Sequence, residues 1–286
     1  MTKKTRGSKS DTSTTRLDDP GLESDSPLDI PHSSFDPWLL WQLADSAFPT
    51  GGFAHSGGLE AAWQLGEIRG RADLLAFIEA GLQQVGHASL PIVMAAFDEP
   101  ENLPEFDQLC EAFTSNHVAN RASRAQGRAF LSAVERVFNP NAEMQSGGKG
   151  DPPVPSGDSP PDTGHWTVPP IGMAAATPKR VFNPVLCSAH FAPVFGATLR
   201  RLKVPRETTA RMFFFHYLRG VLAAAVRLNI VGPMEAQKLQ RKLSPTAEAI
   251  MQACDRLTLD QIAQTSPLLE LWQGAQDRLY SRLFQS

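Results

Sequence analysis

The chain has 286 residues, and 42% of them are hydrophobic. That apolar fraction suffices for a substantial core and excludes a chain that is disordered throughout. The formal net charge of -3 excludes a general electrostatic attraction to nucleic acid or to an anionic membrane, so we expect neither as a partner. The polar N-terminus lacks the apolar segment of a secretory signal, and we expect a cytoplasmic protein.

Two polar segments set the domain organisation. Residues 1–35 are rich in Ser, Thr, Asp and Pro without periodicity, which predicts a disordered leader. Residues 139–184 hold ten of the 23 prolines and six of the 21 glycines, a density that excludes helix interiors and predicts a long flexible insertion. We therefore expect one domain at 36–286, interrupted at about 139–184.

Helical periodicity marks the first part of that domain. A first helix is expected to begin where Asp36 can cap it and Pro37 fits its first turn, and to end near Ala47. Further apolar residues recur at helical spacing in the runs 74–85, 106–117 and 122–137.

The last part of the chain continues this pattern. The apolar stretch 212–231 contains His and Arg residues that argue against a membrane span, and it predicts a buried core helix. Pro233 opens a further helix, while Ser244-Pro245 and Ser266-Pro267 are each typical of a helix start. The final run is expected to place one apolar face on a helix: Leu268, Leu271, Trp272, Ala275, Leu279 and Leu283. The fold class is therefore all-α, a single compact bundle of about ten helices in two halves.

The most unusual local sequence lies between Asp45 and Glu60. It lacks the GxGxxG pattern and the preceding strand of a phosphate loop, and Ala54 stands where a GxSxG nucleophile elbow needs glycine. The structural interpretation is a tight corner between two helices, with Phe53 in the core and Ser56 capping the next helix.

No combination of residues in the sequence predicts chemistry of its own. The seven histidines include no HExxH pattern, and the three cysteines stand far apart, so we expect no metal and no cofactor. His55 is the best placed of the histidines for a metal. No paired carboxylates and no Cys/His arrangement indicate catalytic residues.

Two segments are candidates for contact with other proteins. Arg121, Arg124 and Arg128 form a stripe on one helix face, which is either solvated or docks to an acidic partner. Residues 276–286 keep aromatic and aliphatic side chains beside arginines, although chain ends are usually polar. This segment either packs back onto its own domain or anchors an interface.

Taken together, several stretches resemble the UreF family of urease accessory proteins. They occur in the family's order as 39–49, the Pro-x-Gly-Gly-Phe-x-His-Ser-x-Gly-Leu-Glu signature at 49–60, 190–196, 217–222, 225–228, Gly232, 235–239 and 280–286. The resemblance covers most of the chain outside the two polar segments.

The resemblance implies an all-α adaptor that is not an enzyme and forms homodimers. Its implied partners are a UreD/UreH-type accessory protein, a UreG-type GTPase and the urease apoprotein, on which GTP hydrolysis is coupled to nickel insertion. The tail is implied to hold the UreD/UreH-type protein. The residues implied for partner binding or for a structural motif are Pro49, Gly51, Gly52, Phe53, His55, Ser56, Gly58, Glu60, Arg219, Tyr280, Ser281, Arg282, Leu283 and Phe284.

Two other functions stay open beside the adaptor. A metallochaperone would bind nickel itself. A serine hydrolase would use Ser56 and His55, although adjacent residues on a helix point about 100° apart and pair poorly as nucleophile and base.

Overall fold

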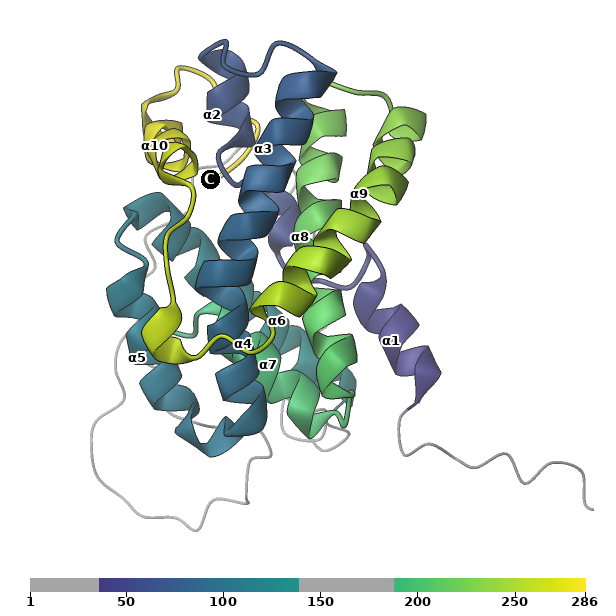
Figure 1. Cartoon of the computed structure of the whole chain (residues 1–286), viewed down its shortest axis with the longest axis vertical. Coiled ribbons are helices and arrows are strands. Elements are labelled where there is room, and N and C mark those ends of the chain that lie inside the picture. Colours follow the sequence, from purple (N-terminus) through teal and green to yellow (C-terminus); the bar gives the residue numbers. More distant parts are fainter. Residues whose placement is uncertain (1–35, 139–187) are drawn as a thin grey trace, which may run out of the picture. The chain divides into compact units, whose positions relative to one another are not determined.

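The computed structural model describes residues 36–138 and 188–286, and the predicted leader and insertion lie outside these ranges. The described residues form helices joined by turns, with no strand among them, which confirms the all-α prediction. In chain order the helices are α1 (Pro37–Ala44), α2 (Leu59–Gln64), α3 (Arg71–Gln84), α4 (Leu90–Asp98), α5 (Leu103–Phe113), α6 (His117–Phe138), α7 (Phe191–Arg201), α8 (Arg206–Arg227), α9 (Pro233–Cys254) and α10 (Pro267–Ala275) (Figure 1).

The core forms where α7 packs against α4 and α6, and where α8 packs against α9. Phe130 of α6 and Phe195 of α7 are completely buried, with ring centroids 5.5 Å apart, and Phe213 of α8 lies 5.4 Å from Phe195. Buried aromatic rings remove a large apolar area from water, so this cluster is a major source of stability. The segment 212–231 is thus a core helix for most of its length, as predicted.

The predicted start at Pro233 is confirmed as the first residue of α9, and two further predicted starts are confirmed as well. The Asp36 carboxylate accepts a hydrogen bond from the Trp38 amide at 2.9 Å, and Pro37 occupies the first turn of α1. Ser266 likewise precedes Pro267 at the start of α10. In both places proline takes a position where no backbone N–H is needed. Helix α1 ends at Ala44, three residues before the predicted end.

The predicted helix start at Ser244-Pro245 is wrong. Helix α9 runs through Pro245 without interruption, and the Ser244 hydroxyl donates to the Gln240 carbonyl at 2.8 Å. Proline inside a helix removes one hydrogen bond, and packing compensates for that loss here. The buried stripe of α9 continues on both sides of Pro245: Ala236, Leu239, Leu243, Ala247, Ile250, Met251 and Cys254.

The predicted helix through 268–283 is also wrong. Helix α10 ends at Ala275, a 3-10 turn follows at Gln276–Arg278, and Leu279 has extended backbone. Leu268, Leu271 and Leu283 are exposed, so they form no buried face. The run 106–117 is likewise interrupted, because α5 ends at Phe113 and α6 begins at His117.

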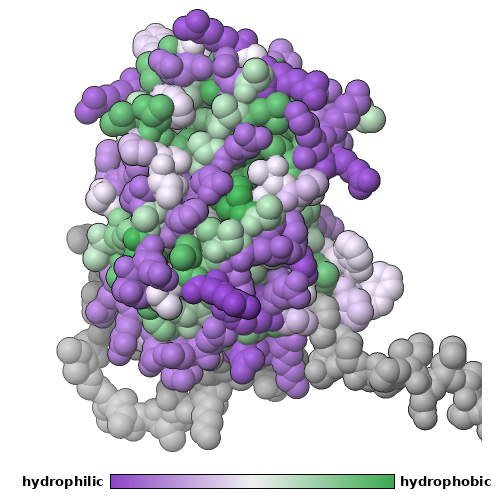
Figure 2. Space-filling model, in the orientation of Figure 1, coloured by the Kyte–Doolittle hydropathy of each residue, from purple (hydrophilic) through white to green (hydrophobic). Residues whose placement is uncertain are grey.

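The face drawn in Figure 2 has apolar residues interspersed among hydrophilic ones. Among the helices of residues 36–138 and 188–286, none combines the length and the apolarity that crossing a bilayer requires.

Candidate functional site

The C-terminal tail, residues 279–286, folds back onto the sequence 49–60, here called the motif (Figure 1). Glu60 in α2 is the centre of this contact, and only 1% of its surface is exposed. Its carboxylate accepts hydrogen bonds from the Leu283 amide at 2.6 Å, the Phe284 amide at 3.1 Å and the Gln276 side-chain amide at 2.6 Å. A buried carboxylate needs such donors, because the loss of its hydration would otherwise cost several kcal/mol. Glu60 therefore fixes the tail.

The end of the tail pairs with the residues just before α2. The Ser286 backbone oxygen accepts from the Ser56 amide at 2.5 Å and from the Ser56 hydroxyl at 3.1 Å. His55 Nδ1 lies 2.6 Å from the Ser286 hydroxyl oxygen, and the Gln285 amide donates to the Ala54 carbonyl at 2.8 Å. Backbone and side-chain bonds together determine the register of the tail on the motif.

Arg227 of α8 joins the motif and the tail from a third direction. Its guanidinium lies 4.1 Å from the ring centroid of Phe53 and 4.2 Å from that of Phe284, within cation–π range of both. The same group donates to the Phe53 carbonyl at 2.6 Å. Phe53 is 72% exposed, so the predicted core position is wrong. Phe53 lies on a short 3-10 turn, which directs its ring toward Arg227 at the surface.

Glycines in the motif permit close approach. Gly51 has φ of +71°, and a Cβ there would lie 3.2 Å from the Ala129 Cβ of α6. Gly58 has φ of +89°, and a Cβ there would lie 3.0 Å from the Gln273 amide nitrogen of α10. Gly58, rather than the predicted Ser56, is the N-cap of α2, and the Ser56 hydroxyl accepts only a long hydrogen bond from the Glu60 amide. Left-handed backbone favours glycine at the cap, which explains the difference.

Helix α6 contacts the base of the tail through Asp277. The Asp277 carboxylate lies 2.8 Å from Arg121, 3.2 Å from His117 and 3.1 Å from Arg282. Arg121 and His117 hold the pKa of Asp277 below its usual range, chiefly through the hydrogen bond from Arg121. One end of the predicted arginine stripe therefore binds the chain's own tail.

The tail residues differ in exposure. Phe284 is 4% exposed, whereas Tyr280 is fully exposed and Leu283 largely so. The Ser281 carbonyl accepts from the Gln64 side chain at 2.9 Å, so the backbone beside Tyr280 is anchored as well. The tail thus packs on its own domain while presenting Tyr280 and Leu283 to solvent.

The remaining predicted residues lie near this contact or support it. Pro49 and Gly52 line a cavity of about 510 Å³ together with His55, Phe284 and Ser286. Arg219 of α8 donates to the Ala44 carbonyl at 2.5 Å and so ties the end of α1 to the core helix. Release of the tail would open one wall of this cavity.

Sequence reasoning did not single out Arg227, Gln276 or Asp277, although Gln276 and Asp277 lie within the candidate segment 276–286. Arg227 lies within one of the stretches that carry the family resemblance, but no local signal connects it with Phe53 and Phe284. Their proximity depends on tertiary structure.

The contact has no catalytic arrangement of Ser56 and His55. The Ser56 hydroxyl donates to the Ser286 oxygen, while His55 Nδ1 pairs with the Ser286 hydroxyl. Within residues 36–138 and 188–286, no group of three or more His, Cys, Asp or Glu side chains is placed to hold a metal ion. The chemistry available at the site is hydrogen bonding, ion pairing and apolar contact.

His55 makes this contact sensitive to acid. Burial, aided by the nearby Arg121 charge, lowers the pKa of His55 from 6.5 to about 4. The unfolded chain therefore takes up a proton at His55 first as pH falls, and stability is lost between about pH 6.5 and pH 4. We expect a loss of about 1–3 kcal/mol from this residue, a range that allows for its partial exposure.

Urea unfolding measured between pH 7.5 and pH 5 tests this expectation. The variant His55→Asn should show a flatter dependence of unfolding free energy on pH. Burial also lowers the pKa of His216, to about 3, so part of the dependence remains in that variant. An unchanged slope in His55→Asn would contradict the assignment.

Comparisons with known proteins identify a family and several relatives of this chain. A family model described as UreF matches residues 68–244, a range between the motif and the tail. The "Urease accessory protein F" of Arabidopsis thaliana is 35% identical over 253 residues, which cover 87% of this chain and 92% of the plant protein.

Two further relatives extend the comparison. The protein of the same description from Oryza sativa subsp. indica is 33% identical over 249 residues, covering 86% of this chain and 84% of its own length. An "Uncharacterized urease accessory protein UreF-like" of Schizosaccharomyces pombe is 26% identical over 248 residues, covering 85% of this chain and 94% of its own. The family match and these identities show that the chain belongs to the UreF family.

Proposed function

We propose that this chain acts in urease maturation as an adaptor without catalytic activity of its own. The observation that carries the proposal is the tail, whose backbone is fixed by Glu60 while the Tyr280 side chain is fully exposed. An exposed aromatic residue on a rigid backbone is typical of an interface anchor.

The rigidity of the tail supports binding of a partner there. Ordering a loose segment on association reduces affinity, and the tail is already ordered by Glu60, Ser56 and Arg227. Tyr280 and Leu283 offer apolar area beside Arg282, a combination enriched at protein interfaces. In this proposal the motif residues position the tail, and the exposed tail residues contact the partner.

The family resemblance supports the finer details. The partner at the tail is the UreD/UreH-type accessory protein, and the complex recruits the UreG-type GTPase to the urease apoprotein in the cytoplasm. GTP hydrolysis then drives nickel insertion into urease. The adaptor acts as a homodimer in this assembly.

The variant Tyr280→Ala/Leu283→Ala tests the proposed contact. We expect its dissociation constant for the purified UreD/UreH-type protein to rise at least about 30-fold, since two central anchors are lost. Stability should change little, because both side chains are exposed. Isothermal titration calorimetry measures the affinity, and urease activity in a strain carrying the variant should fall in parallel.

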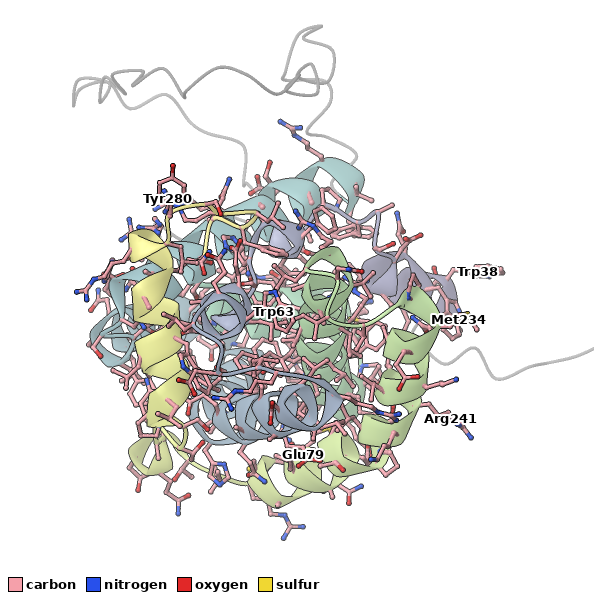
Figure 3. All side chains as sticks on the ribbon, turned by 90° about the horizontal axis from the view of Figure 1, so that it is seen from above. Trp38, Trp63, Glu79, Met234, Arg241 and Tyr280 are labelled. Carbon is pink, nitrogen blue, oxygen red and sulfur yellow. The ribbon has the colours of Figure 1, made fainter. Side chains whose placement is uncertain are left out.

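Met234→Ala is the matched control. Met234 is also an exposed large apolar residue, and Figure 3 places it on the other side of the helices from Tyr280. The Met234→Ala variant should bind the UreD/UreH-type protein with the same affinity as the unmodified chain. Unchanged affinity of the double variant would contradict the role of the tail.

A further inference from the structure

The arginines of α6 and the exposed tail residues lie along one stretch of surface. Arg121 binds Asp277 and also donates to the Gln285 carbonyl, so the tail crosses α6 at that point. Two turns further along α6, Gly51 of the motif packs against Ala129. The helix is therefore flanked by the tail at one end of its arginine stripe and by the motif at the other.

This stretch carries uncompensated positive charge. Asp277 faces Arg121, Arg282 and His117, and Glu111 lies 3.9 Å from Arg124, the middle arginine of the stripe. Within the ranges 36–138 and 188–286, no carboxylate lies within ion-pair distance of the exposed Arg128 or of Arg227. Glu60 does not offset them, because its oxygens are occupied by tail amides. A local excess of arginine thus occurs in a chain whose net charge is -3.

We propose that the partner that engages the tail also docks over α6 through acidic side chains. This inference rests on the proposed function and adds the chemistry of the partner. The docking surface consists of Arg121, Arg128, Arg227, Tyr280, Arg282 and Leu283, and is called the tail–α6 surface. Its partner presents carboxylates around a pocket that accepts Tyr280 and Leu283.

Several features favour a protein with acidic side chains over a nucleic acid. Leu283 and Phe53 are exposed beside the arginines, and an apolar side chain needs an apolar counterpart that a phosphate backbone does not provide. The negative net charge of the chain also opposes general attraction to polyanions. Arginine forms bidentate pairs with carboxylates, which gives such a contact its direction as well as its charge.

Charge reversal at Arg128 separates this inference from the role of the tail. Arg128 is exposed and makes no ion pair in the described chain, so Arg128→Glu should fold normally. We expect its dissociation constant for the purified UreD/UreH-type protein to rise about tenfold at 50 mM NaCl. The difference should shrink at 300 mM NaCl, because salt screens exposed charges.

Arg241→Glu is the matched control. Arg241 is an exposed arginine of α9, and Figure 3 shows it on the opposite side of the helices from Tyr280. The Arg241→Glu variant should bind the UreD/UreH-type protein with unchanged affinity at both salt concentrations. Equal melting temperatures of the two variants would exclude a difference in folding.

The outcomes are distinguishable. Loss of binding in Tyr280→Ala/Leu283→Ala, with unchanged binding in Arg128→Glu, would overturn the acidic contact on α6 and leave the role of the tail intact. Unchanged binding in both variants would overturn the proposed function as well. If Arg128→Glu lost only affinity for a single-stranded oligonucleotide and none for the protein, the surface would be a nucleic-acid site and the inference would be wrong.

Discussion

Replacing Glu60 with alanine is expected to release the tail from the motif. The substitution removes the acceptor for the Leu283 and Phe284 amides and for the Gln276 side chain. Hydrogen bonds to a charged group contribute about 1.5–3 kcal/mol each, and the released amides recover part of this from water. We expect a net loss of about 2–4 kcal/mol in the free energy that docks the tail.

The population of the open tail should therefore rise about 30- to 1,000-fold, since about 1.4 kcal/mol corresponds to a factor of ten. Hydrogen exchange of residues 279–286 and trypsin cleavage after Arg282 measure this population directly. Partner affinity should also fall, although Tyr280 is unchanged, because the partner must then order the tail.

Two variants sharpen the interpretation. Glu67→Ala removes an exposed carboxylate just after α2 and should leave tail exchange unaltered. Glu60→Gln keeps the size of the side chain but turns an amide donor toward the tail amides, so it should also loosen the tail. If the tail amides exchanged hydrogen as slowly in Glu60→Ala as in the unmodified chain, other contacts would suffice to hold the tail on the motif.

Gly196→Ala should destabilise the whole fold. A Cβ at Gly196 of α7 would lie 2.0 Å from the Val93 carbonyl oxygen of α4, and backbone atoms cannot yield as a flexible side chain does. The two helices must separate to admit one methyl group. Overpacking of this kind costs about 1–3 kcal/mol and sometimes more. We expect a loss of about 2–4 kcal/mol in unfolding free energy, measured by urea denaturation.

Gly220→Ala provides the comparison. Gly220 lies inside α8, and no neighbouring atom lies within 4 Å of the position that a Cβ would take there. Alanine there should stabilise the chain by about 0.5–1 kcal/mol, the usual gain in helix propensity. Opposite signs for two glycine-to-alanine changes in neighbouring helices would isolate the effect of close packing. A neutral Gly196→Ala would show that α4 and α7 move apart freely.

Local patterns were sufficient for the fold class and for several helix starts. Asp36-Pro37 and Ser266-Pro267 begin helices as predicted, because the fixed φ of proline, and at Asp36 also the capping carboxylate, act within a few residues. The buried stripe in α3 follows from spacing alone, and the core position of α8 follows from the apolar composition of 212–231. The motif and the tail were recognised individually through their composition and the family resemblance.

Tertiary structure decided the rest. Pro245 lies inside α9 because the apolar stripe on either side of it packs against the core, which outweighs the local signal for a helix start. Phe53 is at the surface because the Arg227 guanidinium meets its ring there. The tail leaves the helical path because Glu60 offers its amides a better acceptor. Periodicity records only which residues share a face of one element. The hydrogen bonds that join Ser56 to Ser286 across 230 positions depend on how the elements pack, and no local pattern encodes them.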